Sequence, residues 1–252
     1  ERETGKKFGD PQNPLLLSVR SGAEHSMPGM MDTILNLGMN EDIVAAMQEK
    51  LGASFVQDCW HRFSVMFRNT AGVDSVPSDP WEQLRQAIQA VIESWKSERA
   101  VAYRKASGIP EHLGTAVNVQ AMVFGNRDEK SSGTGVVFSR DPNTGRPGLY
   151  GEFLPLAQGE DVVSGSNTPM PISYMEKWNE RVYNELVQHV ATLEEHLDAI
   201  ADVEFTVEEG KLWLLQCRPA KPSCLAKATF AVHRVWKNRW TKEEALQALT
   251  PE

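Results

Sequence analysis

Two short segments near the carboxyl end constrain the fold most. DVEFTV (residues 202–207) and LWLLQCR (residues 212–218) are rich in β-branched, aromatic and leucine residues, and a Glu-Glu-Gly-Lys turn separates them. This pattern predicts an antiparallel hairpin. Because side chains alternate along a strand, we expect Asp202, Glu204 and Thr206 on one face and the intervening apolar residues on the other.

The return strand is expected to extend this polar face. Four of its residues alternate onto a common face: Leu212, Leu214, Gln216 and Arg218. A three-residue loop through Gly210 would set Glu204 opposite Gln216 and Asp202 opposite Arg218. The hairpin is therefore expected to bring two carboxylates, an amide and a guanidinium together.

These four groups match the chemistry of a magnesium polyphosphate. Carboxylate and amide oxygens are hard ligands, which Mg²⁺ accepts while it keeps water and phosphate oxygens in its other positions. The planar guanidinium of Arg218 can bind phosphate oxygens bidentately. The alternative is a solvated hairpin with a surface ion pair between Asp202 and Arg218, because half-polar strands are ordinary in antiparallel sheets.

A second candidate anion site lies near the amino end. The apolar segment LLLSVR (residues 15–20) predicts a buried strand that ends on Arg20, and the Gly-, Ser- and Met-rich segment 21–38 predicts an ordered loop. Guanidinium and loop amides together can surround an anion. No GxxxxGK[ST] pattern and no GxGxxG after a strand occurs, so nucleotide binding by those two routes is disfavoured.

The rest of the chain alternates between helical and strand patterns. Apolar spacing predicts helices over 40–71, 81–95, 97–106 and 174–200, and strands over 115–126 and on both sides of a turn at 141–145. The two prolines in residues 219–227 predict a linker. Thr241 and Glu244 have the spacing of a capping box, which predicts a terminal helix.

Composition limits the class of protein. The chain has 252 residues, a net charge of −8 and a pI near 5.4, so we expect one large or two modest domains and no nucleic-acid partner. Its three cysteines have no metal-site spacing and favour a reducing, cytoplasmic compartment. No apolar run is long enough for a membrane helix. The start at Glu1 leads us to expect a piece of a longer protein.

Several longer strings resemble the pyruvate phosphate dikinase family, specifically its amino-terminal, ATP-grasp nucleotide-binding region. The resemblance spans Gly5 to Arg218 and follows the family's order: SVRSGAEHSMPGMMDTILNLG, PWEQL, YRKASGIP, GTAVNVQAMVFGN, GTGVVFSRDPNTG, GEFLPLAQGEDVVSG and DVEFTVEEGKLWLLQCR. It implies an α+β fold of the ATP-grasp type, with a mostly helical insert and a sheet rich in antiparallel strands.

The resemblance also implies site residues. Arg20 resembles the family's polyphosphate-binding arginine, and residues 21–33 resemble a mobile loop over the phosphates. Thr134 and Gly135 resemble a second glycine loop against the nucleotide. The family's adenine and ribose segment, in a cleft between subdomains, corresponds to Glu160, Asp161 and Val162. Glu204 and Gln216 resemble metal ligands, with Asp202 and Arg218 beside the transferring phosphates, which makes Arg20, Asp202 and Arg218 the expected catalytic groups.

The family's architecture implies a division of the chain. Residues 1–114 would form a first ATP-grasp part with the phosphate loop and helical insert, and residues 115–218 a second part with the hairpin. Residues 219–252 would be a linker and helix leading to the phosphohistidine domain. The family's Thr-Ser-His motif surrounds none of the six histidines, so we expect the carrier histidine elsewhere in the full-length chain.

The resemblance implies that ATP, phosphate and pyruvate are interconverted with AMP, diphosphate and phosphoenolpyruvate. This region would bind ATP and Mg²⁺ and pass the β-phosphoryl group to the carrier histidine, with phosphate receiving the γ group. The family's enzymes are expected to be homodimers, in the cytoplasm, plastids or glycosomes. One alternative is a truncated, non-catalytic nucleotide-binding or scaffold module of a phosphoenolpyruvate synthase-like protein. An ATP-independent helical interaction domain, built on residues 40–106, leaves the polar hairpin unexplained.

Overall fold

The chain divides into two compact units. The computed structural model describes residues 1–25, 27, 29–163 and 167–249. The first unit comprises Glu1–Met122 and the second Val123–Glu252. This division falls after residue 122 instead of after 114, because strand β3 (Ala116–Ala121) pairs along its whole length with strand β1 (Leu17–Gly22) of the first unit.

The first unit contains an antiparallel sheet in the order β2-β1-β3. β1 covers Leu17–Gly22 and β2 covers Thr33–Leu37. The expectation of a single loop over 21–38 is therefore wrong, because Ile34 and Leu37 are fully buried and their strand pairs with β1. The same pairing continues β1 beyond Arg20, so this residue lies inside a strand and not at its end.

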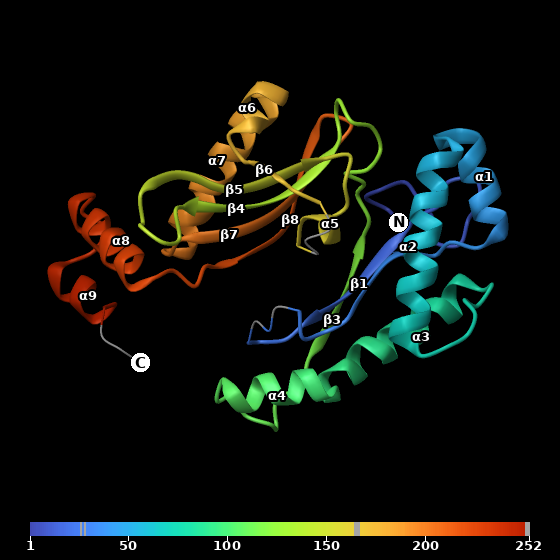
Figure 1. The fold of residues 1–252 in the computed structure, drawn as a ribbon, viewed down its shortest axis with the longest axis horizontal. Helices are drawn as coiled ribbons and strands as arrows, with labels where there is room; N and C mark the ends of the chain where they lie inside the picture. Colours follow the sequence, from blue (N-terminus) through green and yellow to red (C-terminus); the bar gives the residue numbers. More distant parts are fainter. Residues whose placement is uncertain (26, 28, 164–166, 250–252) are drawn as a thin grey trace. The chain divides into compact units, whose positions relative to one another are not determined.

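Helices pack against this sheet and bury its apolar side chains. α2 and α3 both contact β1 or β2 and lie across the sheet in Figure 1. The predicted helix over 40–71 is two helices, because Gly52 has a φ of 89° and interrupts the helical backbone. The helices of this unit are α1 (Glu41–Leu51), α2 (Ala53–Ala71), α3 (Pro80–Glu93), a 3-10 turn (Ser94–Lys96) and α4 (Glu98–Ala106).

The second unit is built on a five-stranded antiparallel sheet in the order β6-β5-β4-β7-β8. Helix α7 contacts β4, β7 and β8 on one face of this sheet (Figure 1). Val137, Phe153, Val203 and Phe205 are fully buried there beside Leu186 of α7. The strands are β4 (Gly133–Arg140), β5 (Pro147–Pro155), β6 (Met170–Pro171), β7 (Ala201–Glu208) and β8 (Lys211–Pro219), and the helices are α5 (Gly159–Val163), α6 (Tyr174–Trp178) and α7 (Glu180–Leu197).

The carboxyl-terminal segment belongs to the second unit. Pro219 completes β8, and the predicted linker over 219–227 gives way to helix α8 (Cys224–Trp236) from Cys224 onward. Ala226 and Phe230 of α8 pack on Ile200 in a separate apolar cluster. Helix α9 (Lys242–Gln247) begins with the capping box of Thr241 and Glu244, which confirms that prediction.

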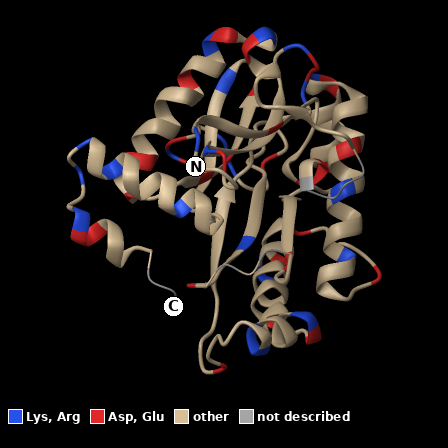
Figure 2. Ribbon diagram, turned by 60° about the vertical axis from the view of Figure 1, so that its left-hand side comes forward, with Lys and Arg blue, Asp and Glu red and all other residues tan. Residues whose placement is uncertain are grey.

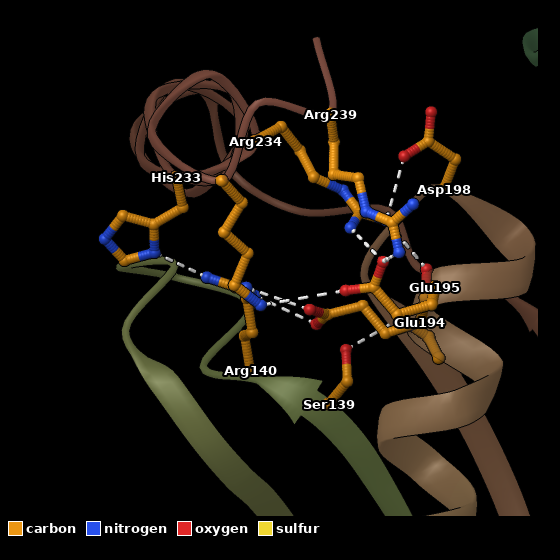
Figure 3. Close-up of polar contacts among 10 residues, drawn as sticks. Ser139, Arg140, Glu194, Glu195, Asp198, His233, Arg234 and Arg239 are labelled. Atoms are coloured by element: carbon orange, nitrogen blue, oxygen red, sulfur yellow. Dashed lines mark hydrogen bonds and ion pairs between the residues drawn. The ribbon is translucent and has the colours of Figure 1, made fainter.

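Buried ion pairs and a hydrogen bond link α8, α7 and the end of β4 (Figure 3). Arg140, at the end of β4, is 3% exposed and forms a bidentate pair with Glu194 of α7 at 2.8 and 2.9 Å. Arg140 also donates to Nδ1 of His233 on α8 at 2.7 Å. Since a guanidinium can only donate, this nitrogen accepts and His233 carries its proton on Nε2.

A second arginine completes this C-terminal network. Arg234 of α8 is 1% exposed and pairs with Glu195 and Asp198, each at 2.8 Å. The Phe230 ring lies near both guanidiniums, 4.9 Å from that of Arg234 and 5.1 Å from that of Arg140. The buried charges of this network are thus paired with acids, which is the condition under which burial of charge is tolerated.

Acidic and basic residues are interspersed along the helices and loops (Figure 2). This distribution fits the modest net charge of −8. Among the described residues, no helix combines the length and the apolar character that a membrane crossing requires.

We predict that Gly135→Ala destabilises the protein by about 1–3 kcal/mol, because the added methyl group would overpack the core. A Cβ at this position would lie 2.5 Å from the Glu152 carbonyl oxygen and 2.6 Å from the Phe205 ring. Urea unfolding would measure the change. Gly159→Ala is the matched control, since nothing lies within 4 Å of its added Cβ. Equal stabilities of the two variants would contradict the prediction.

The C-terminal network predicts an acid-dependent loss of stability. The hydrogen bond from Arg234 lowers the pKa of Glu195 from its ordinary value of 4.5. A lowered folded-state pKa means that this stabilisation is present above pH 4.5 and is lost as the pH falls through the folded-state pKa. We expect the free energy of unfolding of Glu195→Gln to fall less steeply with acidification than that of the wild type.

Urea unfolding at a series of pH values from about 6 to about 3 would measure both slopes. Glu243→Gln is the control, because Glu243 is an exposed glutamate of α9 with no ion pair to any described residue. Parallel pH profiles for the wild type and Glu195→Gln would show that the pair with Arg234 does not stabilise the fold.

Candidate functional site

The hairpin of β7 and β8 has the predicted cross-strand pairs. Asp202 lies opposite Arg218, and Glu204 lies opposite Gln216. The route to this register differs from the prediction: the turn contains only Glu209 and Gly210 between the paired residues 208 and 211, and a β-bulge follows at residue 215. The extra residue of the bulge shifts the register by one, as a three-residue loop would have done.

The bulge also changes which residues of β8 share a face. Leu212 and Cys217 both pack on the core beneath α7, although one number is even and the other odd. The expectation that Leu212 and Leu214 share a face with Gln216 and Arg218 is therefore wrong, because these two leucines lie opposite the core residues Val207 and Phe205. Burial and the Asp202 carboxylate raise the pKa of the Cys217 thiol, which keeps this side chain neutral at physiological pH.

The ion pair between Asp202 and Arg218 is partly buried. Arg218 Nε donates to Asp202 Oδ2 at 2.8 Å, and the exposed fractions of the two side chains are 33% and 10%. The other carboxylate oxygen, Oδ1, is buried and has no hydrogen-bond partner among the described residues. Because an unsatisfied buried acceptor is costly, this oxygen is suited to a further donor or a cation.

Strand β4 continues the polar face of the hairpin. Thr134 lies opposite Thr206 of β7, and their hydroxyl oxygens are 3.1 Å apart. The expectation of a glycine loop at Thr134 and Gly135 is wrong, because both residues lie within β4 between β5 and β7. Gly135 is needed for packing instead, since the Phe205 ring occupies the space beside its Cα.

The predicted adenine and ribose segment forms the short helix α5 beside β4 and β5. Asp161 Oδ2 accepts from the Gln158 backbone N–H at 2.9 Å, which closes the first turn. Asp161 and Val162 are each 8% exposed, while Glu160 is half-buried. The buried Asn126 accepts a hydrogen bond from the Gln158 side chain at 3.3 Å. The sequence did not mark Asn126 as a candidate site residue, although it is the last residue of the predicted strand over 115–126.

Arg20 lies in the first unit, in the central strand of its sheet. Its backbone is opposite Thr33 of β2 and Asn118 of β3, and its side chain is half-buried. The predicted phosphate loop over 21–33 connects β1 with β2, and its residues 26 and 28 lie outside the described part of the chain.

Arg99 of α4 contacts this connection and was not singled out by the sequence. Its Nε donates to the Met30 carbonyl oxygen at 3.1 Å, and it forms an ion pair with Asp32. The backbone N–H of Asp32 also donates to Ser94 Oγ at 3.2 Å. Local spacing in the sequence does not predict this ion pair, because 67 positions separate Arg99 from Asp32.

The oxygen ligands on the hairpin fit magnesium better than zinc or iron. In the described ranges no group of three or more His, Cys, Asp or Glu side chains is arranged to hold a metal ion. Asp202, Glu204 and Gln216 nevertheless present two carboxylates and one amide from paired strands. Mg²⁺ needs only one or two carboxylates when phosphate oxygens and water fill the remaining positions, so this donor set fits it.

Comparison with known proteins places the chain in a family. Residues 1–182 and 167–232 match the family described as "Pyruvate phosphate dikinase, AMP/ATP-binding domain". The "Pyruvate, phosphate dikinase" of Rickettsia conorii is 44% identical across 99% of this chain, and the chloroplastic enzymes of Mesembryanthemum crystallinum and Zea mays are each 41% identical across 100%.

The relatives are much longer than this chain. The match covers 34% of the Rickettsia conorii protein and 31% of each plant protein. The match with the Rickettsia conorii protein extends over 302 positions, more than the 252 residues of this chain, so the relative has residues within this region that the chain lacks. The α+β structure with antiparallel sheets confirms the predicted fold class. The chain belongs to the pyruvate phosphate dikinase family, and it represents the ATP-grasp AMP/ATP-binding domain of that enzyme.

Proposed function

We propose that this chain binds ATP with Mg²⁺ and transfers the β-phosphoryl group to a carrier histidine in another domain of the full-length protein. The overall reaction would convert ATP, phosphate and pyruvate to AMP, diphosphate and phosphoenolpyruvate. The observation that carries this proposal is the shared polar face of β7 and β8, where Asp202 keeps one buried carboxylate oxygen without a partner in the described structure.

Each residue of the polar face has a separate proposed role. Glu204 and Gln216 would hold the metal ion, and Asp202 would orient Arg218 through their 2.8 Å hydrogen bond. Arg218 would then present its remaining N–H groups to the phosphates, as a guanidinium can do while one edge is occupied. Bound Mg²⁺ would supply neutralisation of the phosphate charge.

The other proposed contacts come from the resemblance. Arg20 would bind the polyphosphate, Thr134 and Gly135 would lie along the nucleotide, and residues 160–162 would contact adenine and ribose. Phosphoryl transfer requires mainly positioning and charge stabilisation from a protein. The residues proposed for the nucleotide site therefore need not include a nucleophilic side chain. The proposed partners are ATP, phosphate, and the phosphohistidine and pyruvate-binding domains of the same full-length chain, which we propose is a homodimer.

A non-catalytic scaffold is the second candidate function. It is favoured by the ion pair between Arg218 and Asp202, which already neutralises the guanidinium charge that ATP would need. In this case the polar hairpin would hold nucleotide weakly or not at all.

We predict that Glu204→Ala or Arg218→Ala in the full-length protein abolishes the ATP half-reaction, because each removes a proposed metal or phosphate contact. Exchange of labelled AMP into ATP would measure this half-reaction. The exchange between pyruvate and phosphoenolpyruvate, which would use other domains, should be preserved in both variants. Near-normal AMP exchange in either variant would reject the proposed role of that residue.

Calorimetry on the 252-residue chain would separate the two functions. We expect a saturable heat on titration with ATP and Mg²⁺, and a much smaller heat when EDTA removes the metal, because phosphate charge is then left unmatched. Gln247→Ala, a substitution on α9 in the carboxyl-terminal segment, is a control that should titrate like the wild type. Heat no greater than that of dilution would favour the scaffold.

A further inference from the structure

The first unit contains a pocket whose lining includes none of the residues proposed for the nucleotide site. It has a volume of about 450 Å³ and lies among α3, the 3-10 turn, α4 and residues 111–115. Ile92, Val101 and Leu113 give it apolar walls, and Trp95 and Arg104 also line it. A pocket of this size and lining suits a small organic molecule.

The lining of this pocket includes a buried charge. Arg104 is 4% exposed, and its Nη1 donates to the Trp95 carbonyl oxygen at 2.6 Å. Its Nε is buried without a hydrogen-bond partner, and no carboxylate of the described chain forms an ion pair with Arg104. Buried charges in proteins are normally paired, because removing an ion from water is expensive. Arg104 therefore lacks the counter-charge that such a position calls for.

Local contacts explain where Arg104 lies but do not balance its charge. The guanidinium carbon is 4.1 Å from the centroid of the Trp95 ring, a favourable cation–π distance. The Trp95 carbonyl group is a partial negative charge at the carboxyl end of a helical segment. Neither group carries a full negative charge, so the formal charge of Arg104 stays uncompensated.

The other charged side chains of the pocket keep its charge positive. Lys96 is an exposed second cation on the lining. Glu111 is the acid there, and its carboxylate lies 3.9 Å from the Lys105 ammonium group. Two cations and one already paired acid leave a net positive pocket with apolar walls.

We propose that this pocket binds a small organic anion, a phosphate monoester or a carboxylate on an apolar body. The anionic group would pair with Arg104 and Lys96, and the apolar body would lie against Ile92, Val101 and Leu113. The proposal goes beyond nucleotide binding and uses none of its residues.

A titration of the ¹⁵N-labelled 252-residue chain, followed by amide NMR shifts, tests this directly. Phenyl phosphate should produce saturable shifts at Trp95, Gly114 and Thr115, and should bind about tenfold more tightly than inorganic phosphate because its ring buries apolar area. Phenylacetate in place of phenyl phosphate shows whether the site prefers carboxylates or phosphates. Benzyl alcohol, which is neutral, should produce no saturable shift.

Variants separate the charge from the cavity. Arg104→Gln should weaken phenyl phosphate binding by about tenfold or more, since it removes a charge-assisted contact. Lys50→Gln, which changes an exposed lysine of α1 that does not line the pocket, should bind as the wild type does. If Arg104→Gln fails to fold, Leu113→Trp provides the test, because it fills the pocket without changing any charge and should abolish the shifts.

Three outcomes would overturn the proposal: no saturable shift in the wild type, binding unchanged in both Arg104→Gln and Leu113→Trp, or inorganic phosphate binding as tightly as phenyl phosphate. Arg218→Ala distinguishes this site from the nucleotide site. It should lose the ATP half-reaction in the full-length protein and keep phenyl phosphate binding in the 252-residue chain.

Discussion

The pairing of β7 with two neighbours is the constraint on which the second unit depends. β7 lies between β4 and β8, so its backbone groups find partners along both edges. Its side chains then alternate between two environments: Val203 and Phe205 enter the core beneath α7, and Asp202 and Glu204 join the polar face. A slip of one residue would exchange the two sets. One register therefore fixes both the core and the candidate site.

The polar face of the hairpin has a free-energy cost that packing of the core does not require. Placing Asp202 beside Arg218 in a partly buried position requires desolvation of two charges, and Asp202 Oδ1 is left without a partner in the described residues. In the C-terminal network Arg140 and Arg234 are also paired with acids, and Arg234 Nε is likewise buried without a hydrogen-bond partner among the described residues. The two sites differ in exposure, since the Arg234 side chain is 1% exposed and that of Arg218 is 33% exposed. The hairpin is therefore the site whose guanidinium is open to a ligand.

Local patterns in the sequence were sufficient for much of the architecture. Strand alternation and a turn located the hairpin, and the capping box located the start of the terminal helix at Thr241. Apolar spacing predicted one helix over residues 40–71, but the positive φ of Gly52 divides it into α1 and α2. The spacing of apolar residues alone does not reveal a single interrupted turn. β2 was missed, because its short alternation is preceded by residues typical of loops, and only pairing with β1 makes it a strand.

What the sequence determined by itself is the hairpin and the alternation of residues 202–207 between a polar and an apolar face, because a period of two and a short turn are local properties. Tertiary structure alone decided that a bulge sets this register, that Thr134 and Gly135 lie in a strand, and that Arg104 is buried without a counter-charge. These features depend on contacts between residues that are distant in the chain, so no local sequence pattern predicts them.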